Sequence, residues 1–258
     1  MRLRTVLAVV AVGGAGVFMF QRRQSPPDEL PGTVPSARED SVPPAESPRA
    51  ESPRAEVVGA VSAPAAARDD ADIRMRINDG VSTTYIRDML SQDPMLVRWP
   101  DRRLDALRVW IEPKSTVQNW NPQYPLVAER VFDQWFQAGF PLRFEFQPDS
   151  AGASIHIRWA TSLVAGGRQI GITRKTRDQD GWIVRAEIEI ATFDGLGHAL
   201  SAETVGGVAR HEVGHALGLG HSSRTSDVMY PESMTPVISA ADRATLRLLY
   251  TLPPGTVK

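Results

Sequence analysis

Apolar and polar residues alternate along several short stretches of the chain from Leu107 onward. A period of two is typical of strands with one buried face. Two further stretches flank Asp180-Gly181, a dipeptide that favours a tight turn, and therefore predict a hairpin. The predicted strands are Leu107–Ile111, Leu142–Phe146, Ser154–Trp159 and, in the hairpin, Ile170–Arg174 and Trp182–Ile190.

Other stretches have the spacing of helices. Pro125 suits the first turn of a helix that Gly139 would end, and a short helix over Thr83–Ser91 would end before Pro94. Two more helices are predicted over Ser201–Leu217 and Ala240–Tyr250, the last of them capped by Ser239 with Asp242 three residues on. Because the strands gather before the helix over Ser201–Leu217, we expect an α+β fold with a twisted sheet and helices packed against it.

The N-terminal quarter of the chain has a different character. Basic residues flank an uncharged stretch, Thr5–Phe20, which is typical of an export signal. An uncleaved membrane anchor is favoured, because no convincing cleavage site follows; a removed signal peptide is the alternative. Residues 25–72 hold nine prolines and a short repeat, Glu46–Ala50 and Glu51–Ala55, and predict a disordered Pro/Ala-rich linker.

The predicted organisation is therefore a signal anchor or signal peptide over residues 1–24, a linker over 25–72 and one globular domain over 73–258. The expected location is extracytoplasmic, with a single-pass membrane anchor. If the N-terminal segment is cleaved, the protein would be secreted instead.

Composition narrows the chemistry. The chain has no cysteine, which excludes disulfides, thiolate metal sites and cysteine nucleophiles. Its formal net charge of -1 gives no indication of a nucleic-acid partner. Three of the five histidines fall within eleven residues, so we expect the chemistry there.

That segment reads His-Glu-Val-Gly-His-Ala-Leu-Gly-Leu-Gly-His, from His211 to His221. On a helix His211 and His215 point from one face, because residues four apart lie one turn above each other. Gly218 can end the helix in a left-handed conformation and let His221 return as a third ligand. Three imidazoles leave one tetrahedral position for water, which is typical of a catalytic zinc site, and Glu212 would be its general base.

The eleven residues match the pattern HExxHxxGxxH and are followed by Met229, Tyr230 and Pro231. In these features the chain, over about Leu107 to Tyr250, resembles the metzincin zinc metalloproteases, and its matrixin branch most of all. The resemblance implies a metzincin-like zinc peptidase domain: a twisted mixed sheet, an active-site helix, a Met-turn and a C-terminal helix. It implies a zinc endopeptidase with a protein or peptide substrate.

The resemblance also implies roles for residues outside the metal motif. Met229 would form a floor beneath the metal, and Tyr230 and Pro231 would border a substrate pocket. Substrate would lie extended along an edge strand, because open main-chain groups can bind many sequences. The resemblance points to the strand that contains Ile170, Gly171, Ile172 and Thr173.

Two other functions stay open: a catalytically silent, zinc-stabilised binding module, and a zinc hydrolase of a non-peptide amide. The cysteine that keeps matrixin zymogens latent has no counterpart here. No motif indicates calcium, and nothing indicates an oligomeric state. Of the other histidines, His156 alternates with two isoleucines and is expected at an exposed strand position, and His198 in a loop.

Overall fold

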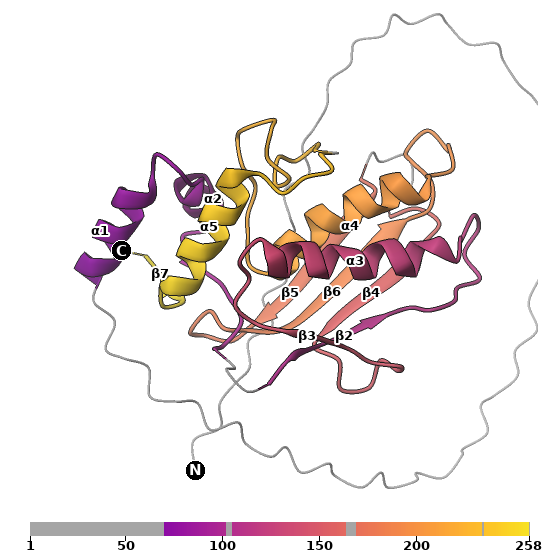
Figure 1. Cartoon of the computed structure of the whole chain (residues 1–258), viewed down its shortest axis with the longest axis horizontal. Coiled ribbons are helices and arrows are strands. Elements are labelled where there is room, and N and C mark those ends of the chain that lie inside the picture. The colour runs from indigo at the N-terminus through magenta and orange to yellow at the C-terminus, as the bar shows by residue number, and fades with distance from the viewer. Residues whose placement is uncertain (1–69, 102–104, 164–168, 234, 258) are drawn as a thin grey trace, which may run out of the picture. The chain divides into compact units, whose positions relative to one another are not determined.

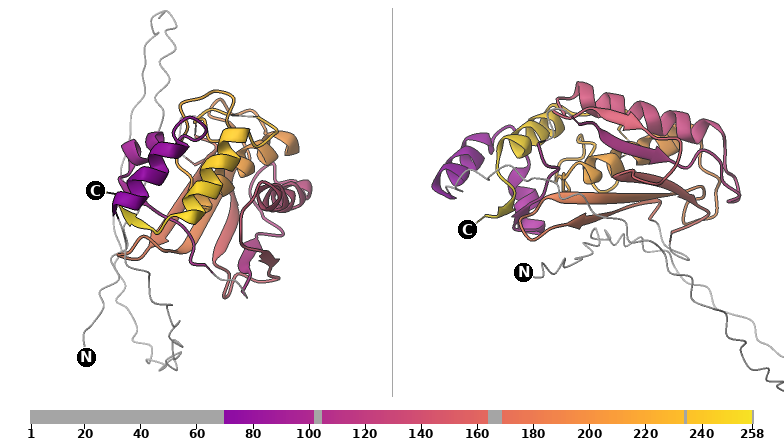
Figure 2. Two further views of the ribbon diagram at one scale, coloured as in Figure 1. Left: turned by 60° about the vertical axis from the view of Figure 1, so that its left-hand side comes forward. Right: turned by 90° about the horizontal axis from the view of Figure 1, so that it is seen from below.

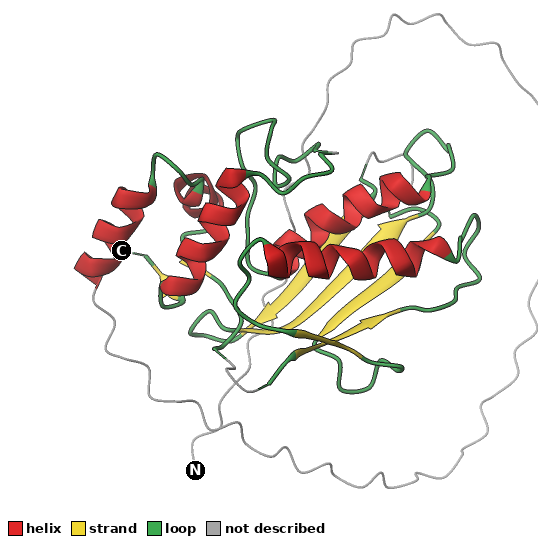
Figure 3. Cartoon of the chain, in the orientation of Figure 1, coloured by secondary structure: helices red, strands yellow, loops and turns green. Residues whose placement is uncertain are grey.

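The computed structural model describes residues 70–101, 105–163, 169–233 and 235–257 (Figure 1). The expected anchor and almost all of the expected linker lie outside these residues. Within them, no helix combines the length and the apolar character that crossing a membrane requires. Figure 3 shows a body of helices and strands. Its elements are α1 (Asp70–Gly80), α2 (Ile86–Gln92), β1 (Met95–Leu96), β2 (Leu107–Ile111), α3 (Gln123–Gln137), β3 (Phe144–Phe146), β4 (Ile155–Ala160), β5 (Gly171–Arg177), β6 (Ile183–Ala191), α4 (Ala202–Ala216), α5 (Ala240–Thr251) and β7 (Gly255–Thr256).

The centre of the fold is a five-stranded sheet in the order β3-β2-β4-β6-β5. The first four strands in this order are parallel to one another, whereas β5 pairs antiparallel with β6 and lies at the edge. This mixed sheet, with its helices, confirms the predicted α+β class. The predicted hairpin is also present, as β5 and β6.

Helices α3 and α4 lie side by side over one face of the sheet (Figures 1 and 2). The alternation along β6 explains this arrangement, because Ala186 and Ile188 are buried while Glu187 between them is exposed. Trp135 of α3 is fully buried and donates a hydrogen bond from its indole nitrogen to the carbonyl of Arg210 in α4, at 3.0 Å. Helix α4 is thus packed on both the sheet and α3.

The predicted boundaries differ from the observed ones by a few residues. Helix α3 begins two residues before Pro125, which lies in its first turn, and β3 is two residues shorter than predicted. The cap of α5 is as expected: the Ser239 hydroxyl accepts from the Asp242 amide, and the Asp242 carboxylate accepts from the Ser239 amide.

The segment before β2 forms a second group of elements at the end of the sheet. Helix α1 was not predicted; Ile73 and Ile77, four residues apart, are its buried residues, and it contacts α5. Strand β1 pairs with β7 near the C-terminus, a pairing too short to be read from alternation. The N-terminal and C-terminal parts of the domain therefore pack together.

Candidate metal centre

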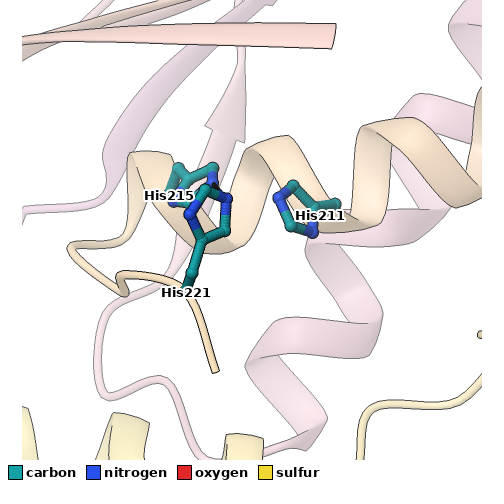
Figure 4. Close-up of side chains that lie close together, drawn as sticks. All are labelled: His211, His215 and His221. Carbon is teal, nitrogen blue, oxygen red and sulfur yellow. Dashed lines mark hydrogen bonds between the residues drawn. The ribbon is translucent and has the colours of Figure 1, made fainter. Parts of the chain in front are cut away.

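Helix α4 and the loop after it bring the three motif histidines together. His211 and His215 project from one face of α4, and His221 lies opposite them on the loop (Figure 4). One nitrogen from each ring lies within 4.8 Å of the others. Gly218, with φ of 103°, ends the helix in the left-handed region, and its amide donates to the His215 carbonyl at 2.9 Å. This turn returns the chain toward α4.

Backbone carbonyls orient the imidazole rings of His211 and His215, the two histidines on α4. Nδ1 of His211 lies 2.7 Å from the Val228 carbonyl oxygen, and Nδ1 of His215 lies 2.9 Å from that of Leu219. A carbonyl can only accept, so each Nδ1 carries the proton and each Nε2 keeps its lone pair. Such a second partner is how proteins set the tautomer and direction of a metal-binding imidazole.

The histidines are also suited to a metal by their charge state. Burial lowers the pKa of His211, although its hydrogen bond to Val228 opposes this. Burial, together with the charges of the other two histidines, lowers the pKa of His215 well below its usual range. Burial lowers the pKa of His221 to about 4, and the charges of His211 and Lys175 act in the same direction. Three neutral imidazoles, with one nitrogen of each ring close to the others, fit a zinc ion.

Glu212 is buried beside the cluster, on the side where α4 meets β5. Burial raises the pKa of its carboxyl to about 7, while a hydrogen bond from Thr173 and the charge of Lys175 oppose the shift. The Thr173 hydroxyl lies 2.6 Å from Oε2 of Glu212 and 2.9 Å from its backbone carbonyl. Gly171 leaves room for the same side chain, since a Cβ there would lie 2.5 Å from Oε1. An edge-strand hydroxyl thus holds a buried carboxylate next to the metal cluster.

Helix α5 holds the Met-turn in place through hydrogen bonds. Met229 is fully buried, and its sulfur lies against Gly214 of α4. The buried carboxylate of Asp242 accepts from the amides of Val228 at 2.8 Å and of Met229 at 3.4 Å. Because the Val228 carbonyl in turn orients His211, the cap of α5 is connected to the metal cluster.

Among the other predicted site residues, Tyr230 is half-buried and Pro231 exposed, directly after Met229. The strand predicted to bind substrate, with Ile170 just before it and Gly171, Ile172 and Thr173 within it, is an edge strand of the sheet. Gly171 and Thr173 face α4, whereas Ile172 is on the other face.

The prediction for His156 was wrong. Its side chain is buried, and Nε2 lies 3.0 Å from the carbonyl oxygen of Ser150. The loop before β4 covers this position, which strand alternation alone does not reveal. His198 lies in an exposed loop, where Nδ1 is 3.0 Å from the Asp194 carboxylate.

Sequence reasoning missed several supporting residues. Asp242 was identified only as part of a helix cap, and Thr173 only as a member of a strand that binds substrate. Gln92 gave no signal at all, yet its side-chain amide bonds to both backbone groups of His221. Asp242 acts across 14 residues, Thr173 across 39 and Gln92 across 129, so no local motif links these residues to the site.

Comparisons with known proteins give a consistent result. The family described as matrixin, Peptidase M10, matches residues 111–251. Metalloendoproteinase 1-MMP of Arabidopsis thaliana is 33% identical over 123 residues, which cover 45% of this chain and 33% of that protein. Metalloendoproteinase 2-MMP of the same plant is 28% identical over 152 residues, which cover 54% of this chain and 38% of that protein. The alignments thus span between 33% and 38% of the length of these relatives.

Proposed function

Because the chain belongs to the matrixin family, we propose that it is a zinc-dependent endopeptidase that cuts peptide bonds in proteins or peptides. The observation that carries the proposal is the meeting of three neutral imidazoles with a buried carboxylate beside them. His211, His215 and His221 would hold the ion. A bound zinc ion supplies a Lewis acid that polarises the scissile carbonyl and lowers the pKa of a water to about 7.

Side chains of the protein itself transfer the protons and hold the transferring group in place. Glu212 accepts a proton from the attacking water at its carboxylate and passes it to the leaving amine. Burial raises the pKa of this carboxyl, which favours the uptake of a proton in the first half of the transfer. Thr173 keeps the carboxylate in place by its hydrogen bond to Oε2. Met229 closes the floor of the site, and Tyr230 and Pro231 border the pocket for the residue after the cut.

We further propose that substrate binds along β5. The Ile170 carbonyl accepts from the amide of Ala191 in β6 at 2.9 Å. In an antiparallel ladder the bonding direction alternates, so the main-chain groups of Gly171 and Thr173 are directed at the open edge. An extended peptide could add to this edge as a further strand.

A change in the peptide tests this placement better than a change in the protein. Proline at Gly171 or Thr173 would remove an outward amide, but would also disturb Glu212, which both residues contact. Peptides N-methylated at single amides near the cut leave the protein intact. We expect a raised KM at alternate methylated positions, whereas an unchanged KM at every position would contradict the strand placement.

For its location, we propose an exported protein held at a membrane by Thr5–Phe20, with the catalytic domain outside. The basic flanks and uncharged stretch of the sequence support this. Fractionation should recover the full-length chain with membranes, with the domain accessible to added protease. A soluble mature chain that begins near Val17 would reject the anchor and keep the export.

The direct test of activity is cleavage-site profiling of the zinc-loaded protein on a peptide library. We expect internal cuts that stop on chelation and resume when zinc is restored. A zinc-loaded protein that cuts no peptide would instead indicate a silent binding module. Hydrolysis restricted to amides other than peptides would indicate a zinc hydrolase of a non-peptide amide.

A further inference from the structure

Of the three histidines in the cluster, His221 alone lies on a loop. His211 and His215 are fixed by the helix and by carbonyl partners of their rings. The position of the His221 ring therefore depends on how its backbone is held. In the described part of the chain, both hydrogen bonds of that backbone go to one side chain, that of Gln92.

Gln92 is the last residue of α2, more than one hundred residues earlier in the sequence. Its Nε2 donates to the His221 carbonyl at 3.1 Å, and its Oε1 accepts from the His221 amide at 3.2 Å. One turn earlier, Oδ2 of Asp88 accepts from the amide of Ser223 at 3.0 Å and from its hydroxyl at 2.7 Å. Residues four apart lie on one face of a helix, so both side chains reach the same loop.

Two more contacts continue this interface. Met89 packs against Gly220, and Arg224 donates from Nη2 to the Thr84 carbonyl at 3.0 Å. The loop from 220 to 224 is thus attached to α2 and the residue before its N-cap at four successive points.

Helix α2 is itself firmly placed, so it can hold the loop. Ile86 is fully buried. At the N-cap, the Tyr85 amide donates to Thr245 Oγ1 and the Tyr85 hydroxyl to Asp242 Oδ1, both at 3.1 Å. The loop that carries His221 is therefore connected through α2 to α5, the same helix that fixes the Met-turn.

We propose that α2 is part of the metal centre, with Gln92 and Asp88 as positioning residues for His221. This inference rests on the proposed zinc-binding function. Residues 86–92 precede the part of the chain that matches the matrixin family, 111–251, so the family match does not supply this helix. Loss of the contacts would let the loop move and would raise the entropy that zinc binding must overcome.

The test is zinc affinity, measured on the full chain by competition with a chromogenic chelator. Gln92→Ala and Asp88→Ala should each weaken zinc binding about threefold to tenfold, and the double variant more than either. Gln92→Glu, which keeps the shape but replaces the donor to the His221 carbonyl, should also weaken it. Ser91→Ala is the matched control, because this exposed hydroxyl bonds only within α2, to the Asp88 carbonyl.

Thermal unfolding of the zinc-free variants separates positioning from general stability. We expect the unfolding temperature of each zinc-free variant to stay close to that of the zinc-free parent, because Gln92 is exposed and Asp88 half-buried. Unchanged zinc affinity in the double variant would overturn the inference, as would a loss of affinity that only follows a loss of the zinc-free fold. If the parent chain itself binds no zinc, the proposed function fails, and this outcome is distinct from both.

Discussion

The hydrogen bond between Thr173 and Glu212 offers a sharp test of how the site works. Thr173→Val removes the hydroxyl and changes the shape of the side chain little. The bond is short, at 2.6 Å, and both side chains are buried, at 7% and 6% exposure. A hydrogen bond to a charged group contributes about 1.5–3 kcal/mol, and 1.4 kcal/mol corresponds to tenfold. We therefore expect kcat/KM at neutral pH to fall about 10- to 100-fold.

The pH profile should change in a defined direction. The Thr173 hydrogen bond stabilises the ionised carboxylate and lowers the pKa of Glu212, against the larger effect of burial. Without the hydroxyl that pKa rises, so the acid limb of kcat/KM should move to higher pH. A bound cation lowers the pKa of Glu212 in the parent and in Thr173→Val alike, so the pKa of the variant stays the higher of the two.

The assay is a fluorogenic peptide followed from pH 5 to 9, with the zinc content of each preparation measured. Thr173→Ser keeps the donor and should restore most of the activity. Thr176→Val, on the same strand but the opposite face, is the control for a lost hydroxyl on β5. If Thr173→Val had parental kcat/KM and an unmoved acid limb, the hydrogen bond would play no part in placing the base.

The same geometry sets the expected behaviour of the motif histidines, of zinc binding at lower pH and of Gly171. Alanine at His211, His215 or His221 should abolish both zinc binding and activity, because each change removes a metal ligand. Metal analysis of the purified variants measures the first loss. Zinc affinity of the parent should fall less between pH 7.5 and 6 than for three histidines of ordinary pKa, because burial lowers all three values; a steep fall would contradict this. Gly171→Ala should displace the Glu212 carboxylate, lower kcat and reduce the free energy of unfolding by about 1–3 kcal/mol. Gly206→Ala should have none of these effects, because the atom nearest to its added Cβ, in Val127, lies 3.6 Å away.

The parts of the fold that were predictable are those with a local cause. Strand β2 was placed to the residue because its alternation is clear, and the cap of α5 because Ser239 and Asp242 are three residues apart. The metal cluster was predictable for the same reason, since His211 and His215 need only a helix to face the same way. Local spacing was sufficient in each case.

The parts that were missed depend on distant contacts. His156 has the alternation of an exposed position, but a loop covers it. The partnership of Gln92 with His221 joins residues 129 positions apart, and no periodic pattern marks either of them for the other. Residues that hold the site in place are therefore harder to find than residues that form it.

The central claim is that Glu212 performs the proton transfer at a zinc site formed by the three histidines. The most direct measurement compares Glu212→Gln with the parent, both zinc-loaded, for zinc bound per chain and for kcat/KM on one peptide. We predict parental zinc content and a fall in kcat/KM of at least about 100-fold, since general base catalysis contributes about 10² to 10⁴. Parental kcat/KM in the fully zinc-loaded variant would contradict the claim.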